Sequence, residues 1–321
     1  MIKIKNLSKT FDLSTGVFNS KNKIYAVSDV SLNINQGNSL GLVGESGCGK
    51  STLARCVAHL IKPSYGQVFI DNTDITKINN KNLQKMRSKF QMVFQDPGES
   101  LNPRMKISSI IGEPLNLHTN LSKDEKKLRI QEVMEAVGLK KEHLNRYPHE
   151  FSGGQKQRIG IGRAIATKPK FIILDEPTSS LDVSIRGQIL KLLKELQNKF
   201  NLTYLLITHD LSVVYNACDE IAVMYLGKIV EYGPTKSIFN TPFHPYTRAL
   251  LSSVPIPDPN IKTKRIKLNG EIPSPLERPS GCVFRSRCPN PTHDCKTGNI
   301  KMKLIEKKPH HWVDQCCVNC G

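Results

Sequence analysis

Residues 44–51 read Gly-Glu-Ser-Gly-Cys-Gly-Lys-Ser, and they follow directly on the short apolar run Ser39–Val43. Two glycines separated by four residues and followed by lysine and serine have the spacing of a phosphate-binding loop, the Walker A pattern. That pattern is meaningful only between a strand and a helix. The apolar run predicts the strand, and a helix is expected to begin near Lys50. This stretch therefore predicts an α/β fold built around a phosphate-binding loop.

Each residue type in this loop has a physical role toward a nucleoside triphosphate. Glycines let backbone N–H groups turn inward around phosphate oxygens, and the following helix adds partial positive charge at its N-terminus. Lys50 would supply a full charge to the β- and γ-phosphates, and Ser51 would offer its hydroxyl to Mg²⁺. We interpret Cys48 as a small loop residue and not as a redox switch. The predicted nucleotide-binding residues of the loop are Gly44, Glu45, Ser46, Gly47, Cys48, Gly49, Lys50, Ser51 and Thr52.

A second apolar run ends in two carboxylates. Phe171–Leu174 is continuously apolar, as expected of a strand buried on both faces, and Asp175 and Glu176 follow it. Because a buried carboxylate is costly without a counter-charge, the pair indicates a cation at this strand end. We expect Asp175 to hold Mg²⁺ through water. We expect Glu176 to act as the general base that polarises the attacking water.

Strand-like runs begin the chain and recur along it. Alternating apolar residues predict strands at residues 2–7 and 27–34, and the polar, glycine-containing segment 12–25 between them predicts a loop. Further apolar strands are predicted at residues 203–208 and 221–226. Since these strands alternate with helix-like segments, the sequence predicts an α/β fold with a mostly parallel sheet.

The middle and the end of the chain differ from this alternation. Between about Lys106 and Lys168 the pattern is helical, and Ser122 with Glu125 predicts a capping box ahead of one helix. This stretch is too long for a single crossover, so it predicts an inserted helical subdomain at about residues 100–168. After about Phe239 the chain is rich in proline and poor in periodicity, which predicts an extension and no further sheet.

Composition limits the class of protein. The chain has 321 residues, of which 38 % are hydrophobic and 23 % charged, and no run approaches the ~18 to 20 apolar residues of a spanning helix. The first residues lack the apolar core of a secretion signal, so any membrane role is expected to come through partner chains. The net charge of +18 is spread along the chain without a nucleic-acid-reading motif, so no nucleic-acid partner is expected.

The segment Phe151–Arg158 reads Phe-Ser-Gly-Gly-Gln-Lys-Gln-Arg and resembles the signature motif of ABC ATPases. This resemblance implies a P-loop NTPase of ABC type, with a RecA-like core, an antiparallel β subdomain and an inserted helical subdomain. It also implies that two such domains pair head to tail, so that each signature closes on the ATP of its partner. The residues implied to contact the partner's ATP are Ser152, Gly153, Gly154, Gln155 and Asp182.

Three further positions fit this family. Gln95, in Val-Phe-Gln-Asp-Pro, is similar to the Q-loop residue that contacts Mg²⁺ and the membrane subunit. Residues 180–182 resemble the D-loop, and His209 resembles the switch histidine that contacts the γ-phosphate. The implied catalytic residues are Glu176, His209 and Gln95, and the implied Mg²⁺ ligands are Ser51, Gln95 and Asp175. Because no catalytic position is missing, the resemblance implies hydrolysis of ATP.

An aromatic side chain usually stacks on the adenine in this family, near the end of the first strand. Phe11 stands at that motif position, and Tyr25, just before the second strand, is the alternative. The polar segment between them leaves both open, and Phe11 is favoured.

The segment after residue 240 narrows the resemblance to one group of ABC ATPases. Residues 242–251 read Pro-Phe-His-Pro-Tyr-Thr-Arg-Ala-Leu-Leu, and residues 281–289 read Gly-Cys-Val-Phe-Arg-Ser-Arg-Cys-Pro, as in ATPases of oligopeptide/dipeptide importers of the OppF/DppF type. Residues 1–240 would then be the ATPase domain, and 241–321 the importer-type extension. The resemblance implies a second homologous ATPase subunit in a heterodimer, two permease subunits and an extracytoplasmic solute-binding protein. It also implies a peripheral position on the cytoplasmic face of the membrane.

Other assignments remain as alternatives. Importers of nickel or another small solute share much of this extension, so the cargo is not fixed. A zinc-containing DNA-repair ABC ATPase is the alternative from a different class. Such proteins interrupt the ATPase with a long coiled coil or a domain insertion, and apart from the helical subdomain nothing of that kind separates the Walker A loop from Asp175 here.

Six of the nine cysteines crowd the end of the chain. Without a secretion signal, metal ligation is favoured over disulfides. Thiolates suit an iron–sulfur cluster or tetrahedral zinc, and a metal-free tail is the third possibility. The resemblance implies a [4Fe-4S] cluster, although the spacing before the fourth cysteine departs from the family pattern. The candidate ligands are Cys282, Cys288, Cys295 and Cys316, with Cys317 or Cys320 as alternatives for the fourth.

Overall fold

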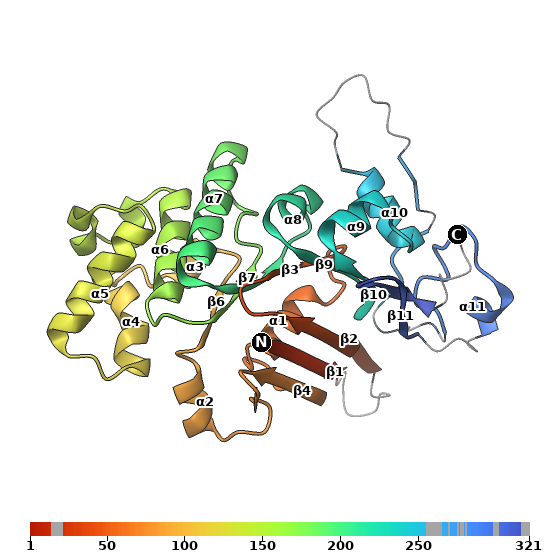
Figure 1. The fold of residues 1–321 in the computed structure, drawn as a ribbon, viewed down its shortest axis with the longest axis horizontal. Coiled ribbons are helices and arrows are strands. Elements are labelled where there is room, and N and C mark those ends of the chain that lie inside the picture. Colours follow the sequence, from red (N-terminus) through yellow and green to blue (C-terminus); the bar gives the residue numbers. More distant parts are fainter. Residues whose placement is uncertain are drawn as a thin grey trace. The chain divides into compact units, whose positions relative to one another are not determined.

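The computed structural model describes residues 1–13, 22–254, 265–268, 270–274, 276, 279, 281–297 and 302–315. Figure 1 shows the helices and strands, coloured along the sequence. The chain forms two compact units. The first unit comprises residues 1–2, 34–39 and 70–207. The second comprises residues 3–33 and 40–69 and the described part of 208–321.

Three parallel strands form the sheet of the first unit, in the order β6-β7-β8. They are β6 (Phe90–Val93), β7 (Phe171–Asp175) and β8 (Thr203–Ile207), and this unit also holds the short β5 (Thr73–Asp74). Every residue of β7 and β8 is buried. The strand predicted from the continuous apolar run Phe171–Leu174 is therefore confirmed. Its carboxyl end places Asp175 and Glu176 at the edge where parallel strands commonly present functional side chains.

The helices of the first unit lie mostly where a helical pattern was predicted. They are α2 (Asn80–Met86), α3 (Pro97–Ser100), α4 (Ile107–His118), α5 (Lys123–Ala136), α6 (Gly153–Ile165) and α7 (Val183–Phe200), with short 3-10 turns at Lys141–Asn145 and Pro148–Glu150. Helix α2 was not predicted, because Leu83 is its one buried residue and no apolar stripe marks it. Helix α7 buries Ile189, Leu192, Leu193 and Leu196, the spacing of one helix face.

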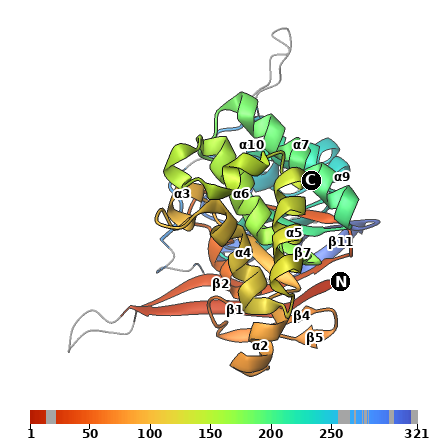
Figure 2. The ribbon, with the colours of Figure 1, turned by 90° about the vertical axis from the view of Figure 1, so that its left-hand side faces the viewer.

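Helices α4, α5 and α6 pack on one another, which confirms the helical stretch predicted between about Lys106 and Lys168 (Figures 1 and 2). The predicted capping box is present. The Ser122 backbone N donates to Glu125 Oε2 at 2.7 Å, and the Glu125 backbone N donates to Ser122 Oγ at 3.3 Å. Buried Arg129 of α5 donates to the carbonyl oxygens of Ile165 and Ala166, so α5 also satisfies the carbonyls at the end of α6.

The strands of the second unit fall in two groups. One sheet has the order β2-β1-β4, and the other has β11-β12-β10-β9-β3. Strand β9 runs parallel to β3, whereas β10, β12 and β11 continue the sheet in antiparallel fashion. The strands are β1 (Ile2–Leu13), β2 (Asn22–Ile34), β3 (Ser39–Val43), β4 (Tyr65–Ile70), β9 (Glu220–Tyr225), β10 (Lys228–Pro234), β11 (Leu304–Lys308) and β12 (His311–Asp314).

Strands β11 and β12 contradict the prediction that the chain after Phe239 adds no further sheet. They form a hairpin whose β12 pairs with β10, with Tyr232 opposite Trp312. The rings of that pair stack with centroids 5.1 Å apart. The hairpin was missed because its buried residues are largely polar. His311 and Glu231 are fully buried and joined at 2.8 Å, so apolar alternation does not mark the strand.

The first two strands are also longer than predicted. β1 continues to Leu13 and β2 begins at Asn22, whereas the polar residues 12–25 predicted a loop. Asp12, Leu13 and Tyr25 are exposed. Because these strand ends bury no residue of this set, they need no alternation of apolar residues, and the sequence pattern does not reveal them. Residues 14–21 of the predicted loop lie outside the described residues.

Five helices complete the described part of the second unit. They are α1 (Lys50–Val57), α8 (Leu211–Ala217), α9 (Thr235–Asn240), α10 (Pro245–Ser252) and α11 (His293–Thr297). Helix α1 begins at Lys50, as predicted, and the loop before it joins β3 to α1. Across the described residues, no helix has both the length and the apolar character needed to cross a membrane.

Candidate nucleotide-binding site

The loop between β3 and α1 has a backbone that glycine makes possible. Gly44, Gly47 and Gly49 have φ values of 155°, 79° and 107°, a region that other residues seldom adopt. A Cβ atom at Gly44 would lie 2.2 Å from the Met224 carbonyl oxygen. A Cβ atom at Gly49 would lie 2.1 Å from the Ala26 carbonyl oxygen. Close backbone approach therefore requires glycine at these two positions, and the Walker A spacing corresponds to a formed loop.

Lys50 holds this loop from within. Its Nζ donates to the carbonyl oxygens of Gly44 at 2.7 Å and Glu45 at 2.9 Å, and its side chain is buried. Its ammonium group thus lies inside the loop, next to the first turn of α1, where backbone N–H groups lack helical partners. A buried cation, a glycine loop and a helix N-terminus together fit a phosphate chain. Ser51 and Thr52 follow in the same turn and are half-buried.

Cys48 is buried in the loop, 3.7 Å from Lys50 Nζ. Burial raises the pKa of this thiol, and the nearby Lys50 charge only partly opposes that effect. The thiol is therefore protonated at neutral pH, and a protonated thiol is a poor nucleophile. This chemistry supports the interpretation of Cys48 as a small loop residue.

The carboxylates after β7 meet the glutamine after β6. Gln95 Nε2 donates to Glu176 Oε2 at 3.2 Å, although 81 positions separate the two residues. Asp175 is buried, and the Glu176 backbone N donates to the Ile207 carbonyl oxygen at 2.9 Å. The parallel order β6-β7-β8 explains the meeting, because the carboxyl ends of these strands share one edge. Gln95, Asp175 and Glu176 belong to the first unit, while the phosphate-binding loop belongs to the second.

The serine-glycine segment opens α6. The Gln155 backbone N donates to Ser152 Oγ at 3.4 Å, and the Ser152 backbone N donates to Gln155 Oε1 at 3.1 Å, which makes a capping box. A Cβ atom at Gly154 would lie 2.6 Å from Ile185 Cγ2 of α7, so glycine allows α7 to approach. Ser152 and Gly153 are exposed, as is Asp182 just before α7. These three residues are open to contact from a second molecule.

The remaining predicted residues lie in the second unit. His209 is exposed after β8, and the following Asp210 caps α8 by accepting from the Ser212 backbone N at 2.9 Å. Phe11 on β1 and Tyr25 on β2 are 36 % and 38 % exposed, so exposure does not distinguish them as adenine partners. Lys9 Nζ lies 4.9 Å from the Phe11 ring centroid. The residue after Tyr25, Ala26, has its carbonyl oxygen close to Gly49, 2.1 Å from where a Cβ atom of Gly49 would stand.

Comparison with known proteins identifies the family. Residues 27–179 match the model of the ABC transporter family, and residues 230–295 match the oligopeptide/dipeptide transporter C-terminal region. The oligopeptide transport ATP-binding protein AppF of Bacillus subtilis is 47 % identical over 317 residues, which cover 98 % of this chain and 96 % of AppF. The chain belongs to the ABC transporter ATP-binding proteins.

Other comparisons agree with this assignment. The dipeptide transport ATP-binding protein DppF of Escherichia coli is 47 % identical over 88 % of this ABC ATPase and 85 % of its own length. The dimeric structure of the ATP-binding cassette MJ0796 bound to ADP and Pi has a TM-score of 0.65 at 32 % identity, covering 73 % of this chain and 99 % of that one. The resemblance to OppF/DppF-type proteins and the ABC-type α/β fold predicted from the motifs are therefore confirmed, and the chain is an ATPase of this family.

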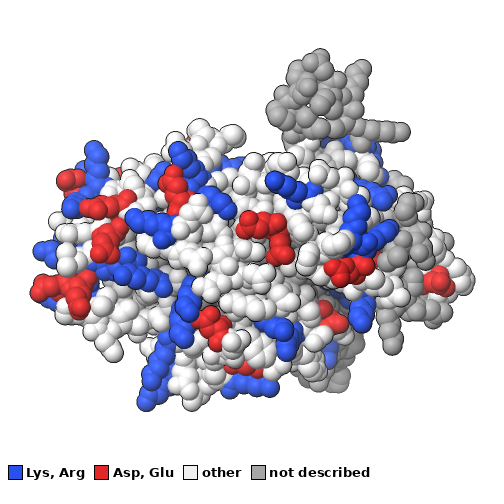
Figure 3. All heavy atoms as spheres, in the orientation of Figure 1, with Lys and Arg blue, Asp and Glu red and all other residues white. Residues whose placement is uncertain are grey.

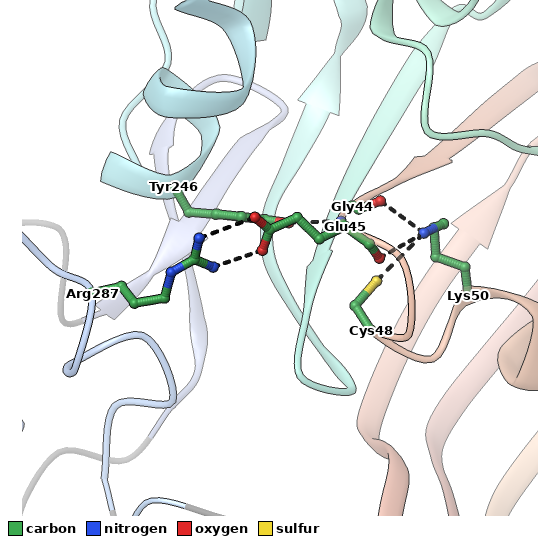
Figure 4. A network of polar contacts seen from close by, with 6 residues as sticks. All are labelled: Gly44, Glu45, Cys48, Lys50, Tyr246 and Arg287. Atoms are coloured by element: carbon green, nitrogen blue, oxygen red, sulfur yellow. Dashed lines mark hydrogen bonds and ion pairs between the residues drawn. The ribbon is translucent and has the colours of Figure 1, made fainter. Parts of the chain in front are cut away.

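Two residues of the extension contact the phosphate-binding loop of this ABC ATPase, and sequence reasoning missed both. Arg287 donates from Nη1 to Glu45 Oε2 at 2.7 Å and from Nη2 to Glu45 Oε1 at 3.1 Å (Figure 4). The Tyr246 hydroxyl accepts from the Glu45 backbone N at 2.8 Å. The two hydrogen bonds to Glu45 raise the pKa of the Arg287 guanidinium, and burial raises the pKa of the Tyr246 phenol. Arg287 is therefore charged and Tyr246 neutral.

The candidate metal ligands do not form a site among the residues that the structure describes. Cys282 and Cys295 are buried and Cys288 is half-buried, and Cys295 Sγ lies 3.1 Å from Thr292 Oγ1. Within the described ranges, no group of three or more His, Cys, Asp or Glu residues could hold a metal ion. Cys316, Cys317 and Cys320 lie outside the described residues. The described residues therefore give no support to the predicted iron–sulfur or zinc site.

Proposed function

We propose that this ABC ATPase binds and hydrolyses Mg·ATP to power a membrane importer of oligopeptides or dipeptides. The observation that carries the proposal is a likeness along nearly the whole chain, extension included, to proteins named for oligopeptide and dipeptide transport. The formed phosphate-binding loop, with its buried Lys50, supports the ATP part of the proposal. Nickel or another small solute is the alternative cargo.

ATP would lie with its phosphates in the loop formed by residues 44–52. Lys50 would exchange the Gly44 and Glu45 carbonyl oxygens for the β- and γ-phosphates, while backbone N–H groups surround the phosphate oxygens. Ser51, Gln95 and Asp175 supply the hydroxyl, amide and carboxylate oxygens that Mg²⁺ prefers, so they would hold it. When bound, Mg²⁺ neutralises charge on the phosphates.

Glu176 would act as the general base. It takes a proton from the attacking water, whose oxygen bonds to the γ-phosphorus while the bond to the ADP oxygen breaks. Gln95 positions this carboxylate through the hydrogen bond of 3.2 Å. We assign His209 to the γ-phosphate and Phe11 to the adenine, with Tyr25 as the alternative adenine partner.

The proposed importer requires further subunits. Ser152, Gly153, Gly154, Gln155 and Asp182 would contact the ATP of a second, homologous ATPase subunit. Two permease subunits and an extracytoplasmic solute-binding protein would complete an importer, with this chain on the cytoplasmic face of the membrane. An iron–sulfur cluster or zinc ion on the terminal cysteines stays a prediction, because the described residues provide no three-ligand group and Cys316, Cys317 and Cys320 lie outside them.

The Glu176→Gln substitution tests the assignment. The amide keeps the shape of the side chain but cannot take a proton from water. We expect ATP binding to remain within about twofold of the wild type and phosphate release to fall by about a hundredfold or more, as for loss of a general base. The binding of a fluorescent ATP analogue with Mg²⁺ and the release of phosphate measure these effects. Undiminished phosphate release would remove Glu176 from the role of base.

A further inference from the structure

The second residue of the phosphate-binding loop is bonded through all of its polar groups. The Glu45 carboxylate accepts two hydrogen bonds from Arg287, its backbone N donates to the Tyr246 hydroxyl, and its carbonyl oxygen accepts from Lys50. Figure 4 shows Lys50 and Cys48 on one side of Glu45 and the two extension residues on the other. Glu45 is thus the point at which the extension reaches the loop.

The two extension residues are themselves firmly held. The Tyr246 side chain is fully buried, and its ring lies 4.8 Å from the Tyr225 ring and 5.7 Å from the Phe284 ring. The Arg287 side chain is 8 % exposed, and its backbone N donates to the Phe284 carbonyl oxygen at 3.0 Å. Because Phe284 is also buried, the turn that carries Arg287 is anchored in the same aromatic cluster as Tyr246. The extension therefore presents a rigid pair of groups to Glu45.

We propose that Arg287 and Tyr246 are positioning residues for ATP binding, because they hold Glu45 and so fix the start of the phosphate-binding loop. This inference rests on the proposed function. When Lys50 turns from the carbonyl oxygens of Gly44 and Glu45 toward phosphate, the loop loses two internal hydrogen bonds. The hydrogen bonds of Glu45 with Arg287 and Tyr246 remain, and they keep the loop in the conformation that receives the phosphates.

Charge gives the pair a second effect. Glu45 adds a negative charge to a loop that receives the negative phosphates of ATP, and Arg287 balances it through two short hydrogen bonds. Without Arg287, the carboxylate would be uncompensated and would oppose phosphate binding. Removal of Arg287 therefore both releases the loop and adds repulsion.

Binding of a fluorescent ATP analogue with Mg²⁺ to the full chain tests the proposal. We expect Arg287→Ala to raise the Kd about tenfold and Tyr246→Phe about threefold, in the range measured for coupled neighbours. Tyr246→Phe keeps the buried ring and removes only the hydroxyl, so it tests the contact even if Arg287→Ala folds poorly. At saturating ATP, the phosphate-release rate of the variants in the assembled complex should stay within about twofold of the wild type, since the loop acts through binding.

A double-mutant cycle and a matched control complete the experiment. Since Arg287 acts through Glu45, the Glu45→Ala/Arg287→Ala double variant should bind no more weakly than Arg287→Ala alone. Arg248 is the control, because this extension arginine donates from Nε to the Pro242 carbonyl oxygen at 3.0 Å. Arg248→Ala should bind as the wild type does.

Several outcomes would overturn the inference. They are equal Kd values for Arg287→Ala and Arg248→Ala, wild-type binding by Tyr246→Phe, and independent, multiplying effects in the double variant. Lys50→Ala is the positive control, because weaker binding of the fluorescent ATP analogue to this variant shows that the analogue occupies the phosphate-binding loop. A wild-type chain that binds no Mg·ATP would contradict the proposed function itself, and binding by the wild type with unchanged variants would contradict only the inference.

Discussion

Glu176 occupies a backbone conformation that residues other than glycine seldom adopt, with φ of 47°. Such a conformation costs about 1–3 kcal/mol and commonly occurs at functional sites. The position after a buried apolar strand predicted a catalytic carboxylate. The conformation itself was not predictable, because it depends on the bond from the Glu176 backbone N to the Ile207 carbonyl oxygen on another strand.

Single substitutions decide whether Phe11 or Tyr25 stacks on the adenine of ATP. We expect Phe11→Ala to raise the KM for ATP about tenfold and Tyr25→Ala less than about twofold, because stacking on a base contributes about 1–3 kcal/mol. Competition by inorganic tripolyphosphate, which has no base, should be unchanged in both variants. A larger effect of Tyr25→Ala on ATP would transfer the role to Tyr25. An equal loss of tripolyphosphate binding would show damage to the loop and no stacking role.

The loop and its support from the extension differ in how far they could be predicted. The Walker A residues lie within one short stretch, so their spacing alone predicted the glycine-rich loop and the place of Lys50 at the start of the following helix. Arg287 stands 242 positions from Glu45, and no local pattern joins them. Their contact depends on a turn anchored by Phe284, which only the folded chain brings to the loop.

Elements with a clear apolar period were predicted better than polar ones. The buried strand β7 and the capped helix α5 follow from their sequences. The hairpin of β11 and β12 does not, because Glu231 and His311 take the place of an apolar pair in the sheet. Glu231 also accepts from the backbone N atoms of Phe243 and His244, so one buried carboxylate joins β10, β12 and the turn before α10. Loss of either partner of such a pair is strongly destabilising.

Helix α10 contains a pH-sensitive cap. His244 is fully buried, and its Nδ1 accepts from the Tyr246 backbone N at 3.1 Å. Burial lowers the pKa of His244 to about 4, with nearby Glu231 and Arg248 acting in opposite directions. The unfolded chain, with an ordinary histidine pKa near ~6.5, then binds more protons below that pH. The contribution to stability is full above about pH 6.5 and is lost as the pH falls toward about 4, by up to about 3 kcal/mol.

His244→Asn tests this effect, since asparagine keeps an acceptor for the cap but does not titrate. We expect the free energy of unfolding of the wild type to fall more steeply than that of the variant between pH 6.5 and 4.5. Urea unfolding followed by circular dichroism at each pH measures the difference. Parallel profiles for the two proteins would show that His244 is not the group responsible.

At the scale of the whole molecule, charge and motifs indicate different things. The net charge of +18 is large, yet Figure 3 shows Lys and Arg side chains dispersed among Asp and Glu on the face in view. The function follows instead from the order of the motifs. The motifs follow one another along the chain in the order found in ABC ATPases. They are the phosphate-binding loop, Gln95, the serine-glycine segment, Asp175–Glu176 and His209. Each motif is a local stretch of sequence, so their order could be read directly, whereas the identity of the partner proposed to contact Ser152 cannot be read from this chain.

Peptide uptake by the assembled importer tests the central claim most directly. The chain is reconstituted in proteoliposomes with the proposed permeases, second ATPase subunit and solute-binding protein, and ATP is supplied on the side of the ATPases. We expect the wild-type complex to accumulate a labelled oligopeptide only with Mg·ATP, and Lys50→Ala in this chain to reduce uptake at least about tenfold by loss of the phosphate contact. Uptake that is independent of ATP, or undiminished by Lys50→Ala, would contradict the account.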